Sequence, residues 1–175
     1  MKSKINQHNN KMLKENTTTT DEEQDASSIR LCNCPQGTVC PFNGICLDKN
    51  VLYKAELTSS LANYGTKEYK GICSTEWKAR YGNHNKAFRH EKYKKETELS
   101  KEIWRIKGKG GTFQIKWSKI SNHASYTPEV GKCNLCLHEK VAIALHEGKN
   151  LLNKRNEIIS RCQHRLKYKL ENLIF

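Results

Sequence analysis

The sequence of 175 residues holds 31 Lys and Arg against 18 Asp and Glu, a net charge of +13, and its pI is about 9.4. This length favours one compact domain with a tail and excludes two substantial domains. No apolar run approaches the roughly 18 residues that span a membrane, and the polar segment 1–24 lacks the apolar stretch of a secretory signal, so we expect an intracellular protein.

The excess of positive charge indicates a polyanionic partner. Basic residues recur from Lys67 through Lys119 and again from Lys149 to Lys169. Each phosphate that such residues neutralise releases counterions and strengthens binding, which favours nucleic acid over a basic surface that only keeps the protein soluble. A membrane-surface role is less favoured, because no strongly amphipathic basic helix stands alone.

The chain opens with a polar leader and a cysteine-rich knuckle. Residues 1–30 include four successive Thr and too few apolar side chains to offset the entropy of ordering, so we expect disorder there. Residues 31–48 contain four cysteines separated mainly by Gly, Pro and Asn, which is typical of a compact knuckle without a core. Residues 49–175 form the main domain.

The main domain is predicted to mix strands and helices. Strands are predicted at residues 51–57, 68–73 and 112–120, the last because Phe113, Ile115 and Trp117 alternate with polar residues. Helices are predicted at residues 74–90, 97–107, 137–147 and 156–173, with Ser74 as the N-cap of the first. This order predicts an α/β fold, a small three-stranded central sheet flanked by helices, preceded by the N-terminal cysteine-rich zinc knuckle.

Seven of the eight cysteines lie in clusters, which in an intracellular protein indicates zinc rather than disulfides. One set supplies four thiolates for a tetrahedral site: Cys32, Cys34, Cys40 and Cys46. A second begins with Cys133-x-x-Cys136 and needs two more ligands, for which Cys162 and His164 are the natural candidates and His138 the competing one. The alternative is that Cys136 and Cys162 are small buried apolar residues. Cys73, alone on a predicted strand, is assigned to the core.

A further group of residues combines side chains that can act together on a phosphate. Tyr53 and Tyr69 fall on the first two predicted strands, and Arg80 and His84 lie four apart on the first predicted helix, so they project from one face. An Arg can brace a phosphate, a His or Tyr can transfer a proton, and a carboxylate such as Glu139 can hold Mg²⁺. Taken singly, each residue is more often a packing or surface residue; the combination points to a site.

In this order the residues resemble the GIY-YIG nuclease motif. The resemblance is carried by Val51-Leu52-Tyr53, Tyr69-Lys70-Gly71, Arg80, His84, Glu139 and Asn153. Within that superfamily the chain is similar to the endonuclease domain of Penelope-like retroelements, through Cys133-Asn-Leu-Cys136-Leu-His-Glu139-Lys140, Leu151-Leu152-Asn153-Lys154-Arg155 and Cys162-Gln163-His164-Arg165. The similarity covers about residues 31–170, although only the tyrosines and the final glycine of the two triplets match the motif literally.

The resemblance implies a role for each matching residue. Tyr53 acts as the general base for water or hydrogen-bonds to it, and Tyr69 positions the substrate. Arg80 stabilises the phosphate, and His84 assists proton transfer. Glu139 binds the single catalytic Mg²⁺, and Asn153 supports the site.

The implied function is Mg²⁺-dependent cleavage of DNA in the nucleus, serving retroelement integration, with a reverse transcriptase as a partner in a longer element-encoded chain. One alternative is a zinc-containing module that binds nucleic acid without cutting it. The other is a structural protein whose basic face recognises an acidic partner.

Overall fold

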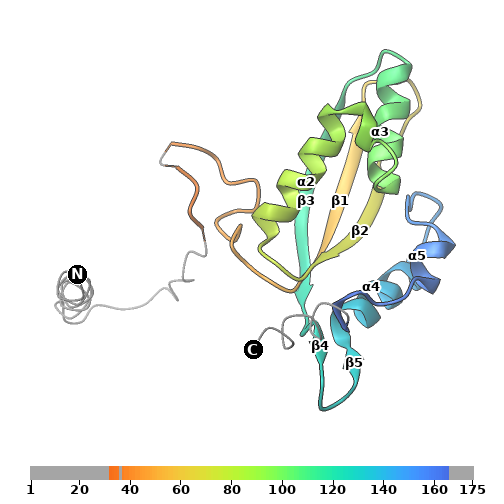
Figure 1. Cartoon of the computed structure of the whole chain (residues 1–175). Coiled ribbons are helices and arrows are strands. Elements are labelled where there is room, and N and C mark those ends of the chain that lie inside the picture. Colours follow the sequence, from red (N-terminus) through yellow and green to blue (C-terminus); the bar gives the residue numbers. More distant parts are fainter. Residues whose placement is uncertain (1–31, 36, 166–175) are drawn as a thin grey trace, which may run out of the picture. The chain divides into compact units, whose positions relative to one another are not determined.

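A computed structural model describes residues 32–35 and 37–165 (Figure 1). The leader predicted at 1–30 and the end of the helix predicted at 156–173 lie outside the described residues. In the part that the structure describes, no helix has the length and apolar character needed to cross a bilayer.

The described fold contains a three-stranded sheet, as predicted, and its strands run antiparallel. Strand β1 (Val51–Ser59) lies between β2 (Lys67–Cys73) and β3 (Phe113–Asn122) (Figure 1). In the β1–β2 register, Tyr53 is opposite Gly71. The fold is therefore mixed α/β, and its three main strands fall where the sequence predicts them.

Two helices cover the face of β1 that carries Tyr53. They are α2 (Trp77–Arg89) and α3 (Glu98–Gly108), with a 3-10 turn, η1 (Glu91–Tyr93), between them. Thr97 caps α3, because its side chain accepts the Ser100 N–H at 3.0 Å. The shared core contains buried residues of β1, α2 and α3: Tyr53, Ala55, Leu57, Trp77, Phe88, Leu99, Ile103 and Ile106.

Helix α2 begins at Trp77, not at the predicted Ser74, because the cysteine knuckle caps it. The backbone N–H of Trp77 donates to the carbonyl of Asp48 at 2.9 Å, and that of Lys78 donates to the carbonyl of Cys46 at 2.7 Å. These bonds satisfy amides that a helix start leaves without partners. Phe42 stacks on Trp77 with ring centroids 3.7 Å apart. The knuckle therefore shares the core of the main domain.

The C-terminal half departs most from the prediction. A two-stranded sheet, β4 (Tyr126–Thr127) and β5 (Lys132–Cys133), was not predicted, because two-residue strands are too short to show a period. Helix α4 (Asn134–Ala144) begins and ends three residues before the predicted range.

The last predicted helix, at 156–173, is wrong as one continuous element. Helix α5 (Arg155–Ile159) stops at Ser160, whose backbone is extended with ψ of 146°. The Nζ of Lys140 donates to the Ser160 carbonyl at 2.6 Å, which fixes the chain where it leaves α5. Cys162 and His164 can then turn back toward α4 instead of continuing a helix.

Candidate active site and metal centres

The hydroxyl of Tyr53 is the centre of the candidate active site. Tyr53 is fully buried on β1, and its Oη lies 2.7 Å from the Nε2 of His84. The Nε of Arg80 donates to the same oxygen at 3.1 Å. Since Arg80 only donates, the Tyr53 proton is directed to His84. Because Arg80 and His84 lie four residues apart on α2, both side chains reach the hydroxyl oxygen of Tyr53.

Burial sets the protonation of this group. It raises the pKa of Tyr53 to about 12, against the opposing charge of Arg80. Burial, with the charge of Arg80 second, lowers the pKa of His84 to about 3. At neutral pH Tyr53 is a neutral phenol and His84 a neutral imidazole. Of the two roles that the resemblance implies for Tyr53, hydrogen bonding to the base fits this state and a free phenolate does not.

Tyr69 and Gly71 on β2 pack against the side chains of His84 and Tyr53. The Tyr69 ring meets His84 edge-on, with centroids 6.1 Å apart at 80°. A Cβ on Gly71 would lie 2.6 Å from the Tyr53 Oη and 2.8 Å from its Cζ. Only glycine leaves room for the phenol in this position. The close approach of Tyr53 therefore explains why the second triplet ends in glycine in this chain.

Asn153 is linked to the site through the backbone of β2. The Lys70 N–H donates to the Asn153 Oδ1 at 2.7 Å, and the Asn153 Nδ2 donates to the Lys70 carbonyl at 2.8 Å. This pair of bonds imitates the pairing of a strand next to Tyr69 and Gly71. Asn153 therefore holds the backbone of the strand that carries Tyr69 and Gly71.

Glu139 comes from α4 and is coupled to the site electrostatically. Helix α4 contacts β1 and β2, and the Lys70 Nζ donates to the carbonyl of Ala142 at 2.6 Å. Burial, followed by the negative charge of Glu157, raises the pKa of Glu139 to about 7, against the charge of Arg80. Burial also raises the pKa of Glu157. A divalent cation would relieve this destabilised pair of carboxylates.

Glu157 is the residue of this region that the sequence analysis missed. It lies in the first turn of α5, where its Oε2 accepts the Lys154 N–H at 2.8 Å. The available signal was its position four residues after Asn153, which puts both near the start of one short helix. A carboxylate at that position reads as an ordinary helix cap until the fold brings α4 beside α5.

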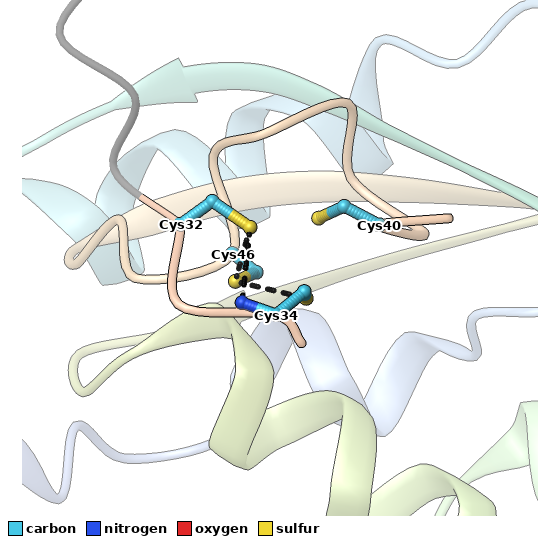
Figure 2. Close-up of side chains that lie close together, drawn as sticks. All are labelled: Cys32, Cys34, Cys40 and Cys46. Carbon is cyan, nitrogen blue, oxygen red and sulfur yellow. Dashed lines mark hydrogen bonds between the residues drawn. The ribbon is translucent and has the colours of Figure 1, made fainter. Parts of the chain in front are cut away.

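The first cysteine cluster has the composition and spacing of a metal site. The sulfur of Cys46 lies 3.4 Å from that of Cys32 and 3.7 Å from that of Cys34. Figure 2 shows these side chains together with Cys40, and all four ligand atoms lie within 4.8 Å of one another. Thiolates around tetrahedral zinc are about 3.8 Å apart, given Zn–S bonds of about 2.3 Å. The cluster can therefore hold a metal ion such as zinc.

The second cluster joins α4 to the chain after α5. The Nδ1 of His164 lies 3.3 Å from the Cys133 sulfur, 3.2 Å from that of Cys136 and 3.8 Å from that of Cys162. These four atoms also meet within 4.8 Å. The competing ligand, His138, is instead stacked on His123 with centroids 3.5 Å apart. Cys73 is buried in the core, as expected.

No family model, curated protein or solved structure matches this chain. The function of the site is therefore inferred from its own geometry.

The contact between Gly71 and Tyr53 gives a sharp test. We expect Gly71→Ala to destabilise the fold by about 1–3 kcal/mol, because the new methyl group displaces a fully buried ring. Gly82→Ala is the matched control. Gly82 lies in α2 with open space around its Cβ position, so alanine should leave stability equal or higher. Urea unfolding measures both, and equal effects would contradict the contact.

The buried neutral His84 predicts a pH dependence of stability. The unfolded imidazole gains a proton below its ordinary pKa of 6.5, whereas the folded one stays neutral down to about pH 3. Its contribution is therefore full above pH 6.5 and is lost as pH falls, by on the order of 2 kcal/mol between pH 7 and 5. Urea unfolding at both pH values provides the test. Between pH 7 and 5, the free energy of unfolding of His84→Gln should fall less than that of the unaltered protein, by that amount. Equal losses in both proteins would contradict a neutral His84.

Proposed function

We propose that this chain is a Mg²⁺-dependent endonuclease of the GIY-YIG type, which hydrolyses DNA phosphodiester bonds in the nucleus and serves the integration of a Penelope-like retroelement. One observation carries the proposal. A single buried oxygen, the Oη of Tyr53, joins Arg80 and His84, while Glu139 is coupled to the same group. A cation, a proton relay and a carboxylate together are what hydrolysis of a phosphodiester needs.

The geometry suggests how the residues share the reaction. Arg80 uses its Nε for Tyr53, so its terminal nitrogens can brace the scissile phosphate as charge builds on the oxygens. Tyr53 can take a proton from the attacking water as it gives its own to the Nε2 of His84. The Tyr69 ring, packed edge-on against the His84 imidazole, helps to fix its orientation.

The carboxylates fit a divalent cation. Glu139, with Glu157 beside it, would hold Mg²⁺, which when bound polarises the phosphate and offsets its charge. Glu139 has carboxylate oxygens, the ligand type that Mg²⁺ prefers, and its raised pKa reflects burial first and the negative charge of Glu157 second. Zinc in the two cysteine clusters would be structural, because all four positions of each tetrahedron are filled by the protein.

Plasmid nicking with and without Mg²⁺ tests the proposal, and Arg80→Ala makes it specific. We expect the variant to lose about a hundredfold or more in cleavage rate, because the transition state loses its guanidinium. Lys86→Ala removes an exposed cation from the same helix and should cleave normally. Full nicking by a well-folded Arg80→Ala protein would refute the assignment. Nucleic-acid binding without nicking by the unaltered chain would identify the non-catalytic module instead.

A further inference from the structure

Two adjoining hollows, neither lined by a residue assigned to the candidate active site, combine positive charge with aromatic rings. The first has a volume of about 720 Å³ and contains Trp104. Five of its lining residues are cations, against one acid: Lys94, Lys95, Lys101, Arg105 and Lys107. The second, of about 260 Å³, is lined by four rings with Arg89 and Lys107 at its side: Tyr81, Phe88, Phe113 and Trp117.

Lys107 connects the two hollows, since it lines both. Its Nζ lies 4.5 Å from the centroid of the Trp104 ring and 5.9 Å from that of Phe113. It also donates to the carbonyl of Phe88 at 2.5 Å, which holds the ammonium between the rings. The hollows therefore form one continuous surface, which we call the basic-aromatic strip, running from η1 and α3 to β3.

Part of the charge of the strip is available to an anion. Lys94 pairs with Glu91 at 2.7 Å on an exposed surface, and a pair of this kind contributes little and exchanges readily for a better ligand. Lys101 and Arg105 pair with Glu98 and Glu102, whose side chains are largely buried, so these two cations are partly exposed but already paired. Among the described residues, Lys95 and Lys107 form no ion pair. Nothing assigned to the active site lines the strip, although Phe88 and Trp117 pack against His84.

We infer that the basic-aromatic strip binds a single-stranded segment of nucleic acid. Phosphates would lie on the lysines of the first hollow, and unpaired bases would stack on Trp104 and on the partly exposed rings of the second, those of Tyr81, Phe113 and Trp117. A groove that alternates cations with aromatic platforms is typical of single-strand binding. A duplex keeps its bases stacked inside, so the rings would be unused, and an acidic peptide would use the cations alone. The strip goes beyond the proposed cleavage, because it needs no reaction at Tyr53.

The experiment measures binding in the Glu139→Gln protein without added Mg²⁺, so that no cleavage interferes. The probes are a labelled oligothymidylate of about 12 nucleotides, an abasic strand of the same length, a duplex, and polyglutamate of equal charge. We expect Trp104→Ala to weaken oligothymidylate binding about tenfold or more and to change abasic binding little. Since the Trp104 Nε1 donates to the Ala87 carbonyl at 2.9 Å, Trp104→Phe serves as the variant that keeps a ring in the fold, with intermediate affinity.

A charge variant completes the test. Replacing Lys94, Lys95 and Lys101 together by Gln should reduce the salt dependence of single-strand binding by about 2 in slope, at roughly 0.7 per lost phosphate contact. The control replaces three exposed lysines outside the strip, Lys49, Lys132 and Lys149, and should have a smaller effect. Equal losses in both triple variants, equal affinity for abasic and intact strands, or equal binding of polyglutamate or duplex would overturn the inference. An unaltered chain that never nicks DNA but shows the expected differences would refute the proposed function and support the strip.

Discussion

Glu139→Gln should abolish Mg²⁺-dependent nicking of plasmid DNA while DNA affinity remains at least unchanged. Glutamine keeps the shape of the side chain and removes the charge that would hold the cation. The basic surface is untouched, so attraction to DNA persists. Folding penalises the charged carboxylate, as shown by its pKa of about 7. We therefore expect the variant to be at least as stable as the unaltered protein at pH 8.

Three measurements separate a catalytic from a structural role for Glu139. They are nicking rate, DNA affinity by anisotropy, and urea unfolding at pH 8. Glu147→Gln, a change of the same kind at an exposed position just beyond α4, should leave all three nearly unchanged. A Glu139→Gln protein that loses affinity and stability in step with activity would show that Glu139 supports the fold instead.

Removal of zinc should unfold the knuckle and disable the site, with the largest change in stability expected for this protein. Structural zinc contributes on the order of 10 kcal/mol in small finger domains. The carbonyls of Cys46 and Asp48 in the knuckle cap the start of α2, one turn before Arg80. Cys133 is the N-cap of the helix that carries Glu139. Each cluster therefore anchors the start of a helix that supplies a site residue.

Elemental analysis should find about two zinc ions per chain, following the four-ligand rule. Cys133→Ser should lower cleavage more than DNA binding, because it displaces α4 and leaves the basic residues of α2 and α3 in place. Cys73→Ala is the matched control, since Cys73 is buried outside both clusters and should not change zinc content. Metal-free protein that is folded and fully active would contradict the whole scheme.

Local signals in the sequence were sufficient for much of the fold. The alternation of Phe113, Ile115 and Trp117 located β3, and the helical spacing of Leu99, Ile103 and Ile106 located α3 within a residue. The start of α2 was missed because carbonyls from Cys46 and Asp48, distant in the chain, cap it. Periodicity within a window cannot contain that information.

The sequence likewise predicts one part of the candidate site, and the other part depends on tertiary packing. The helical spacing of Arg80 and His84 predicts that they share a face, and the structure brings both to Tyr53. The proximity of Glu139 and Glu157 depends on how α4 and α5 pack, which no spacing encodes. The sequence could nominate Asn153, but its bonds to Lys70 cross 83 positions and appear only in three dimensions.

The arrangement at the two sides of the sheet also bears on self-association. The outer side of β2 is already partly paired. Leu151 forms a parallel β-bridge with Glu68, and the Asn153 side chain hydrogen-bonds to the backbone N–H and carbonyl of Lys70. A second molecule therefore has little backbone to pair with there. In the described part of the chain, β3 pairs only with β1 and exposes Lys116, while its Lys119 forms an ion pair with Asp48. Lysines on an outer strand repel the like-charged strand of another copy. One side is thus covered and the other charged, so the sheet resists the edge-to-edge growth that begins fibrillar aggregation.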